Sequence, residues 1–458
     1  MASTSDSANL AAIFKAYDVR GIVPDQLDDA LARSVGAAFV HVTGAPQVVV
    51  GHDMRPSSPG MAGAFADGAA SAGADVVHIG LASTDQLYFA SGHLGMAGVM
   101  FTASHNPAQY NGIKMCRAHA VPIGAETGLL EIRDAVADAA SRPAGRQGEL
   151  SEHNVLEAYA AHLLSLAPVR GRRLRVVVDA GNGMAGLTAP TVFGRLGSDQ
   201  VELVPMYFEL DGSFPHHEAN PIDPANLVDL QERVVAERAD IGLAFDGDAD
   251  RCFIVDERGR AVPPSTLTAL IATRELAREP GATVIHNLIS SRAVPEIVRE
   301  HGGIPVRTRV GHSFIKATMA QTGAIFGGEH SGHFYFRDFW KADSGMLAAL
   351  HALAALAEVD VELSVLLHDY ERFVASGEIN TLVHDQQAVL EELEKTYDGR
   401  SDITLDHLDG LTVSAANGWF NVRGSNTEPL LRLNAEGEDE VTMTRIRDEV
   451  LAVIRRDA

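Results

Sequence analysis

The chain has 458 residues, 46% of them hydrophobic, and this length suggests three to four domains of ordinary size. Its two cysteines exclude a disulfide-rich scaffold and a four-cysteine zinc site. A net charge of -24, from 37 Lys and Arg against 61 Asp and Glu, repels nucleic acid and anionic membranes, so we expect neither as a partner.

The N-terminal residues have no basic segment before a long apolar core, which argues against a signal peptide. The longest apolar stretch, 346–357, is too short to span a bilayer and predicts a buried helix. Cys116 and Cys252 are interpreted as small packing residues. These features predict a cytoplasmic protein, and the sequence specifies no oligomeric state.

Apolar strand-like segments alternate with Ala-rich helical segments along most of the chain. Strands are expected within 47–53, 75–80, 96–106, 173–183, 201–207, 239–250, 282–291, 304–312 and 324–333, with a helix at 60–72. The pattern restarts twice, which predicts three similar α/β domains with mixed, mostly parallel sheets.

The last part of the chain has a different pattern. Past Arg372 we expect a helix, several short strands between 401 and 436, and a closing amphipathic helix at 440–456, which together form a smaller α+β domain. The predicted domains are 1–150, 151–257, 258–370 and 371–458.

Polar loops directly follow several predicted strands, at 51–53, 102–106, 179–183 and 246–250. Ligands gather at the carboxyl ends of strands in parallel α/β sheets. We therefore expect loops from several domains to line one shared cleft.

The strongest candidate for chemistry is the segment DGDADR, with carboxylates at Asp246, Asp248 and Asp250. Alternating carboxylates in a glycine-containing loop suit a hard divalent cation. An EF-hand is rejected because Arg251 stands where that loop needs Gly and the flanking segments look like strands. The plainer alternative is a solvated acidic turn.

Two further segments have the composition of ligand-binding loops. RGSNTEP, 423–429, offers N–H, hydroxyl and guanidinium donors to a phosphate, and Arg432 follows it. GEHSGH, 328–333, offers carboxylate, hydroxyl and imidazole groups to sugar hydroxyls. A surface turn and a glycine-rich hairpin are the plainer alternatives. A zinc site at His330 and His333 is disfavoured, because the two are not spaced along a helix as in HExxH.

Other candidates carry little weight alone. Ser104 in TASHNP reads as a turn residue unless the rest of the chain gives it a partner. Tyr17, Arg20, Lys114 and His312 are equally ambiguous, since an isolated His is usually structural.

TASHNP, DGDADR, GEHSGH and RGSNTEP occur together, in this order and spread over the whole chain. In this respect the sequence resembles the α-D-phosphohexomutase family, and most closely its bacterial phosphomannomutase/phosphoglucomutase branch. The resemblance implies four domains around one cleft, with Ser104 as a phosphoserine that binds Mg²⁺ together with Asp246, Asp248 and Asp250.

The resemblance also implies roles for the remaining candidates. Those for proton transfer and charge stabilisation are Arg20, Lys114, Arg251 and His312, and those for substrate binding are Tyr17, Glu329, Ser331, His333, Arg423, Ser425, Asn426, Thr427 and Arg432. The implied reaction interconverts mannose 6-phosphate and mannose 1-phosphate, with the glucose pair as further substrates. It passes through a hexose 1,6-bisphosphate, and glucose or mannose 1,6-bisphosphate would be an activator.

Three alternatives stay open from the sequence. One is a phosphoglucosamine mutase, although SNTEP is more similar to the mannose/glucose branch than SGTEP would be. The second is a phosphatase that acts through a phosphoserine, and the third is a sugar-phosphate-binding regulator without activity. The preferred sugar among mannose, glucose and glucosamine is not fixed by the sequence.

The chain departs from the family pattern at three places. His52 stands where an Arg is common, and Thr84-Asp85 stands where a Thr-Pro pair is expected. Ile289 stands where a lysine is often found, which puts one phosphate or sugar contact in doubt but not the reaction.

Overall fold

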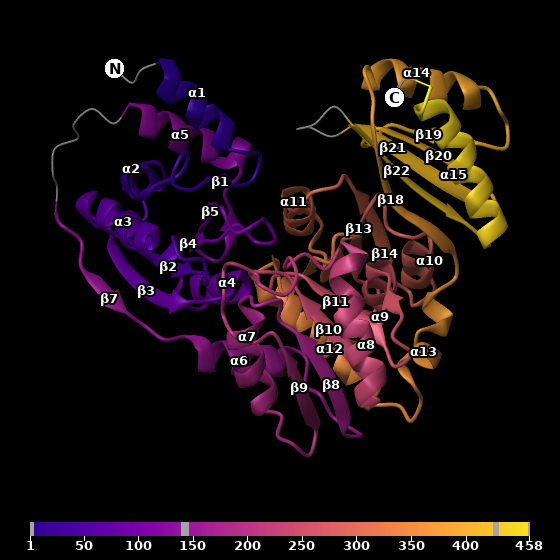
Figure 1. Ribbon diagram of the computed structural model, residues 1–458, viewed down its shortest axis with the longest axis horizontal. Helices are drawn as coiled ribbons and strands as arrows, with labels where there is room; N and C mark the ends of the chain where they lie inside the picture. Colours follow the sequence, from indigo (N-terminus) through magenta and orange to yellow (C-terminus); the bar gives the residue numbers. More distant parts are fainter. Residues whose placement is uncertain (1–3, 139–145, 425–429, 457–458) are drawn as a thin grey trace. The chain divides into compact units, whose positions relative to one another are not determined.

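The computed structural model describes residues 4–138, 146–424 and 430–456 and divides the chain into two compact units. Unit 1 consists of Met1–Pro264 and Ser331–Val365, and unit 2 consists of Ser265–His330 and Leu366–Ala458. The chain therefore leaves unit 1, passes through part of unit 2, returns to unit 1 and finishes in unit 2. Figure 1 traces this path by colour.

The first sheet of unit 1 has seven strands in the order β1-β5-β4-β2-β3-β7, with β6 paired to β5. Strands β2, β3, β4 and β7 run parallel, whereas β1, β5 and β6 are antiparallel to their neighbours. The strands are β1 (Val19–Ile22), β2 (Gln47–His52), β3 (Asp75–Leu81), β4 (Ala97–Phe101), β5 (Tyr110–Arg117), β6 (Val121–Pro122) and β7 (Leu150–Glu152).

Helices α1 (Thr4–Ile13), α2 (Asp29–Thr43), α3 (Ser58–Ser71), α4 (Thr84–Leu94) and α5 (Leu129–Ala137) accompany this sheet, with a 3₁₀ turn at Ala125–Thr127. Asp28 and Ser83 cap α2 and α4 by accepting backbone N–H groups in the first turn. Apolar residues of α2, α3 and α5 and of strands β2 and β4 form one buried core. This core fixes the positions where β2 and β4 end.

The second sheet of unit 1 has the order β12-β11-β10-β8-β9. Its strands are β8 (Leu174–Asp179), β9 (Val201–Met206), β10 (Ile241–Phe245), β11 (Cys252–Asp256) and β12 (Ala261–Val262). Strand β10 runs parallel to β8 but antiparallel to β11, so residues 246–251 form the tight connection between β10 and β11.

Unit 1 contains further helices, 3₁₀ turns and a hairpin. They are α6 (Leu156–Leu166), α7 (Ala185–Gly194), a 3₁₀ turn at Pro224–Leu227, α8 (Val228–Glu237), the hairpin β16 (Phe334–Phe336) and β17 (Ala342–Asp343) with a 3₁₀ turn at Arg337–Phe339, α12 (Gly345–Ala357) and the start of α13 (Leu363–Leu366). Helix α12 contains the long apolar stretch, and all of its residues are buried.

Unit 2 contains a parallel group, in which β13 (Thr283–Asn287) pairs with β14 (Ile304–Thr308) and β15 (Phe326–Gly328). Helices α9 (Pro264–Arg278), α10 (Ala293–Glu300) and α11 (His312–Thr322) accompany these strands. A 3₁₀ turn, His368–Tyr370, leads into the last part of the chain.

The C-terminal part of unit 2 is an antiparallel sheet in the order β18-β22-β21-β20-β19. The strands are β18 (Val374–Leu382), β19 (Thr404–Asp406), β20 (Leu411–Ala415), β21 (Gly418–Gly424) and β22 (Leu430–Gly437), and the helices are α14 (Gln386–Tyr397) and α15 (Glu440–Ile454). Apolar residues of α14, α15 and the sheet form a separate core.

The fold class predicted from the sequence is confirmed: three α/β domains with mixed sheets are followed by a smaller C-terminal domain. The order predicted past Arg372 was wrong at one point, because strand β18 precedes helix α14. This edge strand has no fully buried residue, so it lacks the apolar alternation that marks a strand. The domain boundaries near 150, 257 and 370 stay a prediction. Among the described residues, no helix combines the length and apolar character needed to cross a bilayer.

Candidate active site

Ser104 lies in the loop that follows the carboxyl end of β4. Its backbone is left-handed, with φ 51, and its N–H donates to Thr102 Oγ1 at 2.9 Å. The side chain is nearly buried, and its hydroxyl donates to Asp246 Oδ2 at 2.7 Å. The serine is therefore not an ordinary surface turn residue, because its hydroxyl is aimed at a carboxylate of another sheet.

The three aspartates of the DGDADR loop occupy the connection from β10 to β11 and are buried. The turn is closed by the Ala249 N–H, which donates to the Asp246 carbonyl at 3.0 Å, and Ala249 itself is left-handed, with φ 60. One carboxylate oxygen from each aspartate lies within 4.8 Å of the others. The loop thus gathers three acidic groups at one point.

Gly247 is required by the approach of the two loops. A Cβ atom at this position would lie 2.4 Å from the Ser104 carbonyl oxygen, closer than any real contact allows. Its own carbonyl accepts the Met184 N–H at 2.9 Å. The absence of a side chain at Gly247 therefore lets the backbone of the DGDADR loop contact the backbone of the loop that carries Ser104.

Cationic side chains compensate the buried carboxylates. Lys114 Nζ on β5 donates to Asp248 Oδ2 at 2.7 Å and to Asp250 Oδ2 at 2.6 Å. Arg251 Nε donates to Asp246 Oδ2 at 2.9 Å. These contacts bring together Lys114, Arg251 and the three aspartates predicted from separate segments of the sequence.

The electrostatic environment differs between the aspartates. Burial raises the pKa of Asp246 to about 7 against the opposing effect of Arg251, and repulsion from Asp250 and Asp248 adds to the rise. Burial also disfavours the charged form of Asp250, but Lys114 and His333 overcome it and hold the pKa of Asp250 well below its usual range. Asp248 and Asp250 together raise the pKa of Lys114 well above its usual value against the effect of burial. Lys114 is therefore a permanent cation.

The carboxylates fit a hard divalent cation. Within the described residues, Asp248 Oδ1 and Asp250 Oδ1 are buried oxygens that accept no hydrogen bond. Oxygen ligands from several carboxylates suit Mg²⁺, and a cation would relieve the repulsion that raises the pKa of Asp246. The Ser104 hydroxyl contacts the same cluster through its hydrogen bond to Asp246.

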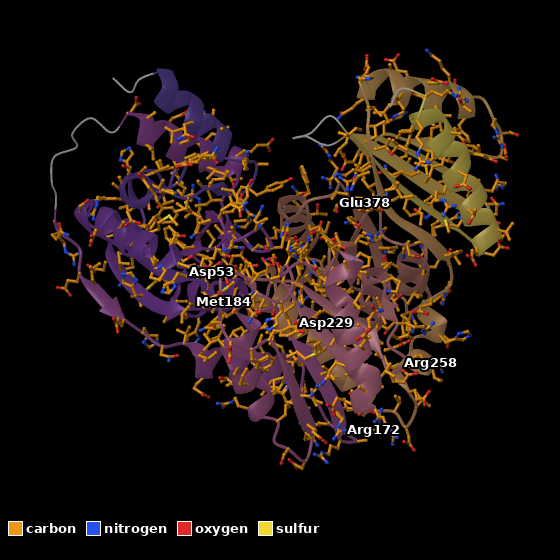
Figure 2. All side chains as sticks on the ribbon, viewed as in Figure 1. Asp53, Arg172, Met184, Asp229, Arg258 and Glu378 are labelled. Atoms are coloured by element: carbon orange, nitrogen blue, oxygen red, sulfur yellow. The ribbon has the colours of Figure 1, made fainter. Side chains whose placement is uncertain are left out.

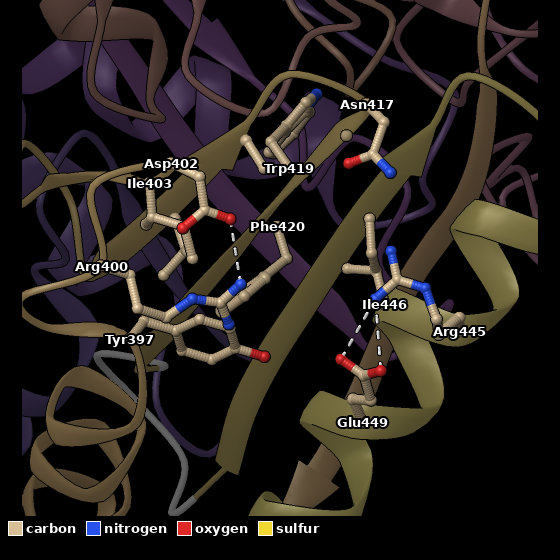
Figure 3. Close-up of a pocket in the computed structure, with 13 residues that line it drawn as sticks. Tyr397, Arg400, Asp402, Ile403, Asn417, Trp419, Phe420, Arg445, Ile446 and Glu449 are labelled. Carbon is tan, nitrogen blue, oxygen red and sulfur yellow. Dashed lines mark hydrogen bonds and ion pairs between the residues drawn. The ribbon is translucent and has the colours of Figure 1, made fainter.

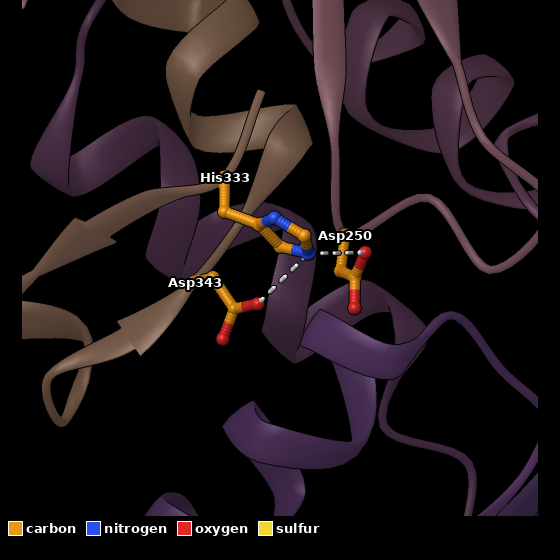
Figure 4. Close-up of side chains that lie close together, drawn as sticks. All are labelled: Asp250, His333 and Asp343. Atoms are coloured by element: carbon orange, nitrogen blue, oxygen red, sulfur yellow. Dashed lines mark ion pairs between the residues drawn. The ribbon is translucent and has the colours of Figure 1, made fainter. Parts of the chain in front are cut away.

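His333 lies against the same cluster, between two carboxylates (Figure 4). Its Nε2 is 3.5 Å from Asp250 Oδ1 and 3.9 Å from Asp343 Oδ2, and its Nδ1 is 2.9 Å from Ser331 Oγ. Ser331 and His333 were predicted to contact sugar hydroxyls. The geometry places both beside the aspartate loop of unit 1.

Arg20 approaches the serine loop from β1. Its Nη1 donates to the Ala103 carbonyl at 3.2 Å and to the Asn106 side chain, while Nη2 pairs with Asp18. Tyr17 is half-buried in the turn before β1, beside Gly124. Arg20 therefore lies against the loop that carries Ser104.

A second group of predicted residues lies in unit 2. Arg423 on β21 and Arg432 on β22 are direct cross-strand partners. Glu378 on β18, labelled in Figure 2, bridges them: Arg423 Nη2 donates to its Oε2 at 2.7 Å and Arg432 Nη1 donates to its Oε1 at 3.2 Å. Both Nε atoms are buried and donate no hydrogen bond within the described residues. Two guanidinium groups thus share one carboxylate and keep donors for a further anion.

The other predicted residues of unit 2 are placed as follows. Glu329, at the end of β15, is buried, and its Oε1 accepts the Gly311 N–H at 3.1 Å. His312 is the first residue of α11, and its side chain lies outside the described part. Ser425, Asn426 and Thr427 lie outside the described residues.

A cavity of about 180 Å³ lies elsewhere in the C-terminal domain (Figure 3). It is lined by Tyr397 and Trp419 and by two ion pairs, Arg400 with Asp402 at 3.1 Å and Arg445 with Glu449 at 3.2 Å. None of the predicted site residues lines it. Because each arginine already has a carboxylate partner, the cavity does not have the character of a phosphate site.

Four consecutive segments match the phosphoglucomutase/phosphomannomutase family. Residues 11–142, 157–259 and 263–373 match its alpha/beta/alpha domains I, II and III, and residues 378–453 match its C-terminal domain. The chain belongs to the phosphoglucomutase/phosphomannomutase family.

Full-length relatives support this assignment. The chain is 40% identical to a protein of Xanthomonas campestris pv. campestris named "Phosphohexose mutases", with 97% of this chain and 99% of that protein covered. It is 37% identical to the phosphomannomutase of Escherichia coli K12, with coverage of 96% and 98%. The crystal structure of a phosphoglucomutase/phosphomannomutase family protein from Burkholderia thailandensis superposes with a TM-score of 0.88 at 34% identity, covering 100% of this chain and 98% of that one.

Sequence reasoning did not predict several contacts around the aspartate cluster and around the arginine pair of unit 2. Thr84 donates through Oγ1 to Asp248 Oδ2 at 2.5 Å and through its N–H to the Asp248 carbonyl at 2.9 Å. Asp343 was not singled out, and neither was Glu378, which stands in an edge strand without a motif. Thr84 stands four residues past the end of the predicted strand 75–80, and this position in a loop after a strand was the signal that the sequence offered.

The three departures from the family pattern have distinct local settings. Asp85 is fully buried and accepts hydroxyl donors from Ser83, Tyr159 and Ser344, the last two at 2.7 and 2.6 Å. Ile289 packs with Leu288 and Trp419 in an apolar cluster, so this position makes no polar contact through its side chain. His52 is half-buried, and its Nδ1 lies 2.9 Å from the Asp53 carbonyl oxygen.

Proposed function

We propose that this protein is a Mg²⁺-dependent phosphohexomutase that interconverts mannose 6-phosphate and mannose 1-phosphate, and also the glucose pair. The observation that carries the proposal is the hydrogen bond of 2.7 Å from Ser104 Oγ to Asp246 in a cluster of three buried aspartates. The full-length similarity to phosphomannomutases supports the reaction class.

In this proposal Ser104 carries a phosphoryl group in the resting enzyme. A hydroxyl of the bound hexose phosphate attacks the phosphorus, the bond from phosphorus to Ser104 Oγ breaks, and a hexose 1,6-bisphosphate forms. The sugar hydroxyl loses its proton to a basic side chain as the new bond forms. Return of the other phosphate to Ser104 completes the interconversion.

The residues of unit 1 would stabilise the transferring group. Lys114 and Arg251 stay cationic, because their carboxylate partners raise their pKa values despite burial. With Arg20 they offset charge on the phosphoryl oxygens, and His333 lies between two carboxylates, with its Nε2 3.5 Å from Asp250 Oδ1 and 3.9 Å from Asp343 Oδ2. A Mg²⁺ ion held by Asp246, Asp248, Asp250 and the phosphorylated serine would neutralise charge on the phosphoryl oxygens.

The residues of unit 2 would hold the substrate. Arg423 and Arg432 bind the phosphate that is not transferred, with Ser425, Asn426 and Thr427 as further donors. Glu329 binds sugar hydroxyls, together with Ser331 and Tyr17 of unit 1, and His312 serves proton transfer or charge stabilisation.

A bisphosphate primer follows from this mechanism. The first transfer leaves Ser104 bare while the bisphosphate is bound, so escape of the intermediate strands the enzyme without its phosphate. A hexose monophosphate cannot replace the lost group. Catalytic glucose or mannose 1,6-bisphosphate should therefore act as an activator.

The decisive experiment measures turnover of phosphatase-treated enzyme with and without added glucose 1,6-bisphosphate. We expect no activity without the primer and full recovery with it. Full activity without primer, with Ser104 shown by mass spectrometry to be unphosphorylated, would contradict the mechanism. Release of inorganic phosphate at the rate of substrate loss would identify a phosphatase instead.

Two alternatives remain testable in the same assay. Preferred turnover of glucosamine 1-phosphate over the mannose and glucose substrates would identify a phosphoglucosamine mutase. Binding of sugar phosphates without turnover, unchanged in Ser104→Ala, would identify a regulator.

A further inference from the structure

Arg55 is a buried arginine that has no place in the mechanism above. It follows β2, three residues before the start of α3, and its side chain is completely buried. A buried guanidinium is unfavourable unless its charge and its donors find partners. The partners of Arg55 therefore indicate what the residue does.

All five N–H donors of this guanidinium are used. Nη1 donates to the carbonyls of Pro107 and Tyr110, both at 2.9 Å, and Nη2 donates to the carbonyls of Ser104 at 2.9 Å and Asn106 at 2.7 Å. Nε donates to Asp53 Oδ2 at 3.2 Å. Four of the five acceptors are backbone carbonyls of one loop, residues 104–110, which begins with the proposed nucleophile.

Asp53 holds the arginine in this position. Its Oδ1 accepts the Arg55 N–H at 3.0 Å and the Ser58 hydroxyl at 2.6 Å. Asp53 is fully buried and is labelled in Figure 2. The ring of Phe214 lies 5.2 Å from the guanidinium carbon and covers it. The Arg55 guanidinium is thus held by its ion pair with Asp53 and by the ring of Phe214.

The Ser104 carbonyl is the critical acceptor. Ser104 has the left-handed backbone that L-residues other than Asn and Asp rarely adopt, so some contact must hold it there. Arg55 Nη2 binds its carbonyl, and the backbone of Gly247 lies against the same oxygen. Together they set the direction in which the Ser104 side chain leaves the backbone.

We propose that Arg55 is a positioning residue for the mutase reaction: it holds the Ser104 loop so that Oγ faces the Asp246 cluster. This inference rests on the proposed function. Phosphoryl transfer depends mainly on positioning and charge stabilisation, and a displacement of about 1 Å can lower a rate by about 10²-fold. Arg55 acts on the reaction through the backbone of Ser104 and touches neither substrate nor metal in this scheme.

The test compares Arg55→Lys with Arg33→Lys. Lysine keeps the charge but cannot reach four carbonyls with a planar fork. Arg33 is a matched control, because it lies on α2 of the same domain and makes an exposed ion pair with Asp67 at 2.8 Å. We expect Arg55→Lys to lower kcat by about 10²-fold with KM changed less than about threefold, and Arg33→Lys to change neither.

Two readouts separate positioning from a loss of folded protein. The first is the rate of a single turnover by enzyme whose Ser104 phosphorylation has been quantified by intact mass, so that inactive molecules are not counted. The second is the melting temperature. A merely structural role would lower the melting temperature while leaving the single-turnover rate of phosphorylated molecules unchanged, and this outcome would overturn the proposal.

A second variant decides the matter if Arg55→Lys does not fold. Ser58→Ala removes one hydrogen bond from Asp53 and loosens the arginine without removing it, so we expect the single-turnover rate to fall by about fivefold to tenfold. An unchanged rate in that folded variant would contradict the proposal.

If wild-type enzyme interconverts hexose phosphates but the variants match it, this inference fails and the proposed function stands. Absence of turnover in the primed wild type would instead remove the proposed function.

Discussion

The two groups of functional side chains differ in how their charges are compensated. In unit 1, three buried aspartates face Lys114 and Arg251 and the Ser104 hydroxyl, so most charged atoms have a partner within the protein. In unit 2, Arg423 and Arg432 share one glutamate and have Nε donors without a partner among the described residues. In the proposed function, the first group carries out a reaction that is the same for every sugar, whereas the second binds the substrate. Substitutions in unit 1 should therefore lower kcat, and those in unit 2 should change KM or the choice of sugar.

The largest expected effect is at Ser104. Ser104→Ala should lower kcat by roughly 10⁴-fold or more for mannose and glucose phosphates alike, because the nucleophile itself is lost. Intact-mass measurement and peptide mapping should find one phosphate on Ser104 in the wild type and none in the variant. Residual activity within tenfold of wild type would show that unit 1 is not the reaction centre.

Next in size is the loss of a metal ligand. Asp248→Asn should lower kcat by about 10³-fold, the equivalent of several kcal/mol of transition-state stabilisation. Chelation should abolish wild-type turnover and Mg²⁺ should restore it. Asp229→Asn is the control, because Asp229 on α8 lies outside the aspartate loop and accepts the Tyr207 hydroxyl at 2.7 Å. Full turnover in the presence of excess chelator would contradict the metal assignment.

A buried acid outside the reaction centre should affect stability and not kcat. Burial raises the pKa of Asp85 to about 6, although three hydroxyl donors oppose the shift. Because the native pKa exceeds the unfolded value, the protonated acid stabilises the native state at low pH, and this contribution is lost between about pH 4 and pH 6. The free energy of unfolding of the wild-type protein, measured relative to that of the Asp85→Asn variant, should therefore fall by about 3 kcal/mol between pH 4 and pH 7.5.

Urea denaturation of both proteins at the two pH values measures this difference. The variant keeps an amide oxygen for two hydroxyls but cannot ionise. If the wild-type protein and the Asp85→Asn variant differed in unfolding free energy by the same amount at pH 4 and at pH 7.5, Asp85 would not titrate in this range.

The smallest effects are expected in unit 2, where two substitutions should separate phosphate binding from sugar choice. Arg423→Ala should raise KM by about 10-fold to 10²-fold for every substrate, because all carry the same phosphate. Glu329→Ala should change the mannose-to-glucose ratio of kcat/KM by about tenfold. Arg400→Ala, in the remote cavity, is the control. If Arg423→Ala altered only the sugar ratio, the two roles would be wrongly assigned.

Sequence reasoning predicted the candidate reaction centre because its parts stand after strands. Ser104 follows β4 and Asp246 follows β10, and both positions were marked by apolar runs that end in polar residues. Lys114 was ambiguous alone and gained meaning from the four-motif resemblance, whereas Arg251 belongs to the DGDADR segment itself. Lys114 contacts aspartates that are more than a hundred residues away in the sequence, and Arg251 contacts Asp246 across the connection from β10 to β11. No local sequence pattern predicts these contacts.

The supporting contacts were beyond the reach of pattern reasoning. Arg55 and Asp53 resemble an ordinary surface pair in sequence, and only burial and the five hydrogen bonds reveal their role. Glu378 was missed because β18 is an edge strand without apolar alternation. Such contacts depend on tertiary packing, which a single sequence does not display.

The fixed carbonyl of Ser104 has a consequence for the order of events in a full cycle. With its backbone held by Arg55 and bordered by Gly247, the serine can move its oxygen only by turning about the Cα–Cβ bond. That rotation is far shorter than the distance between the two ends of a hexose. In the proposed mechanism Ser104 therefore cannot travel to the second phosphate, so the sugar would have to make the half-turn while the loop stays still.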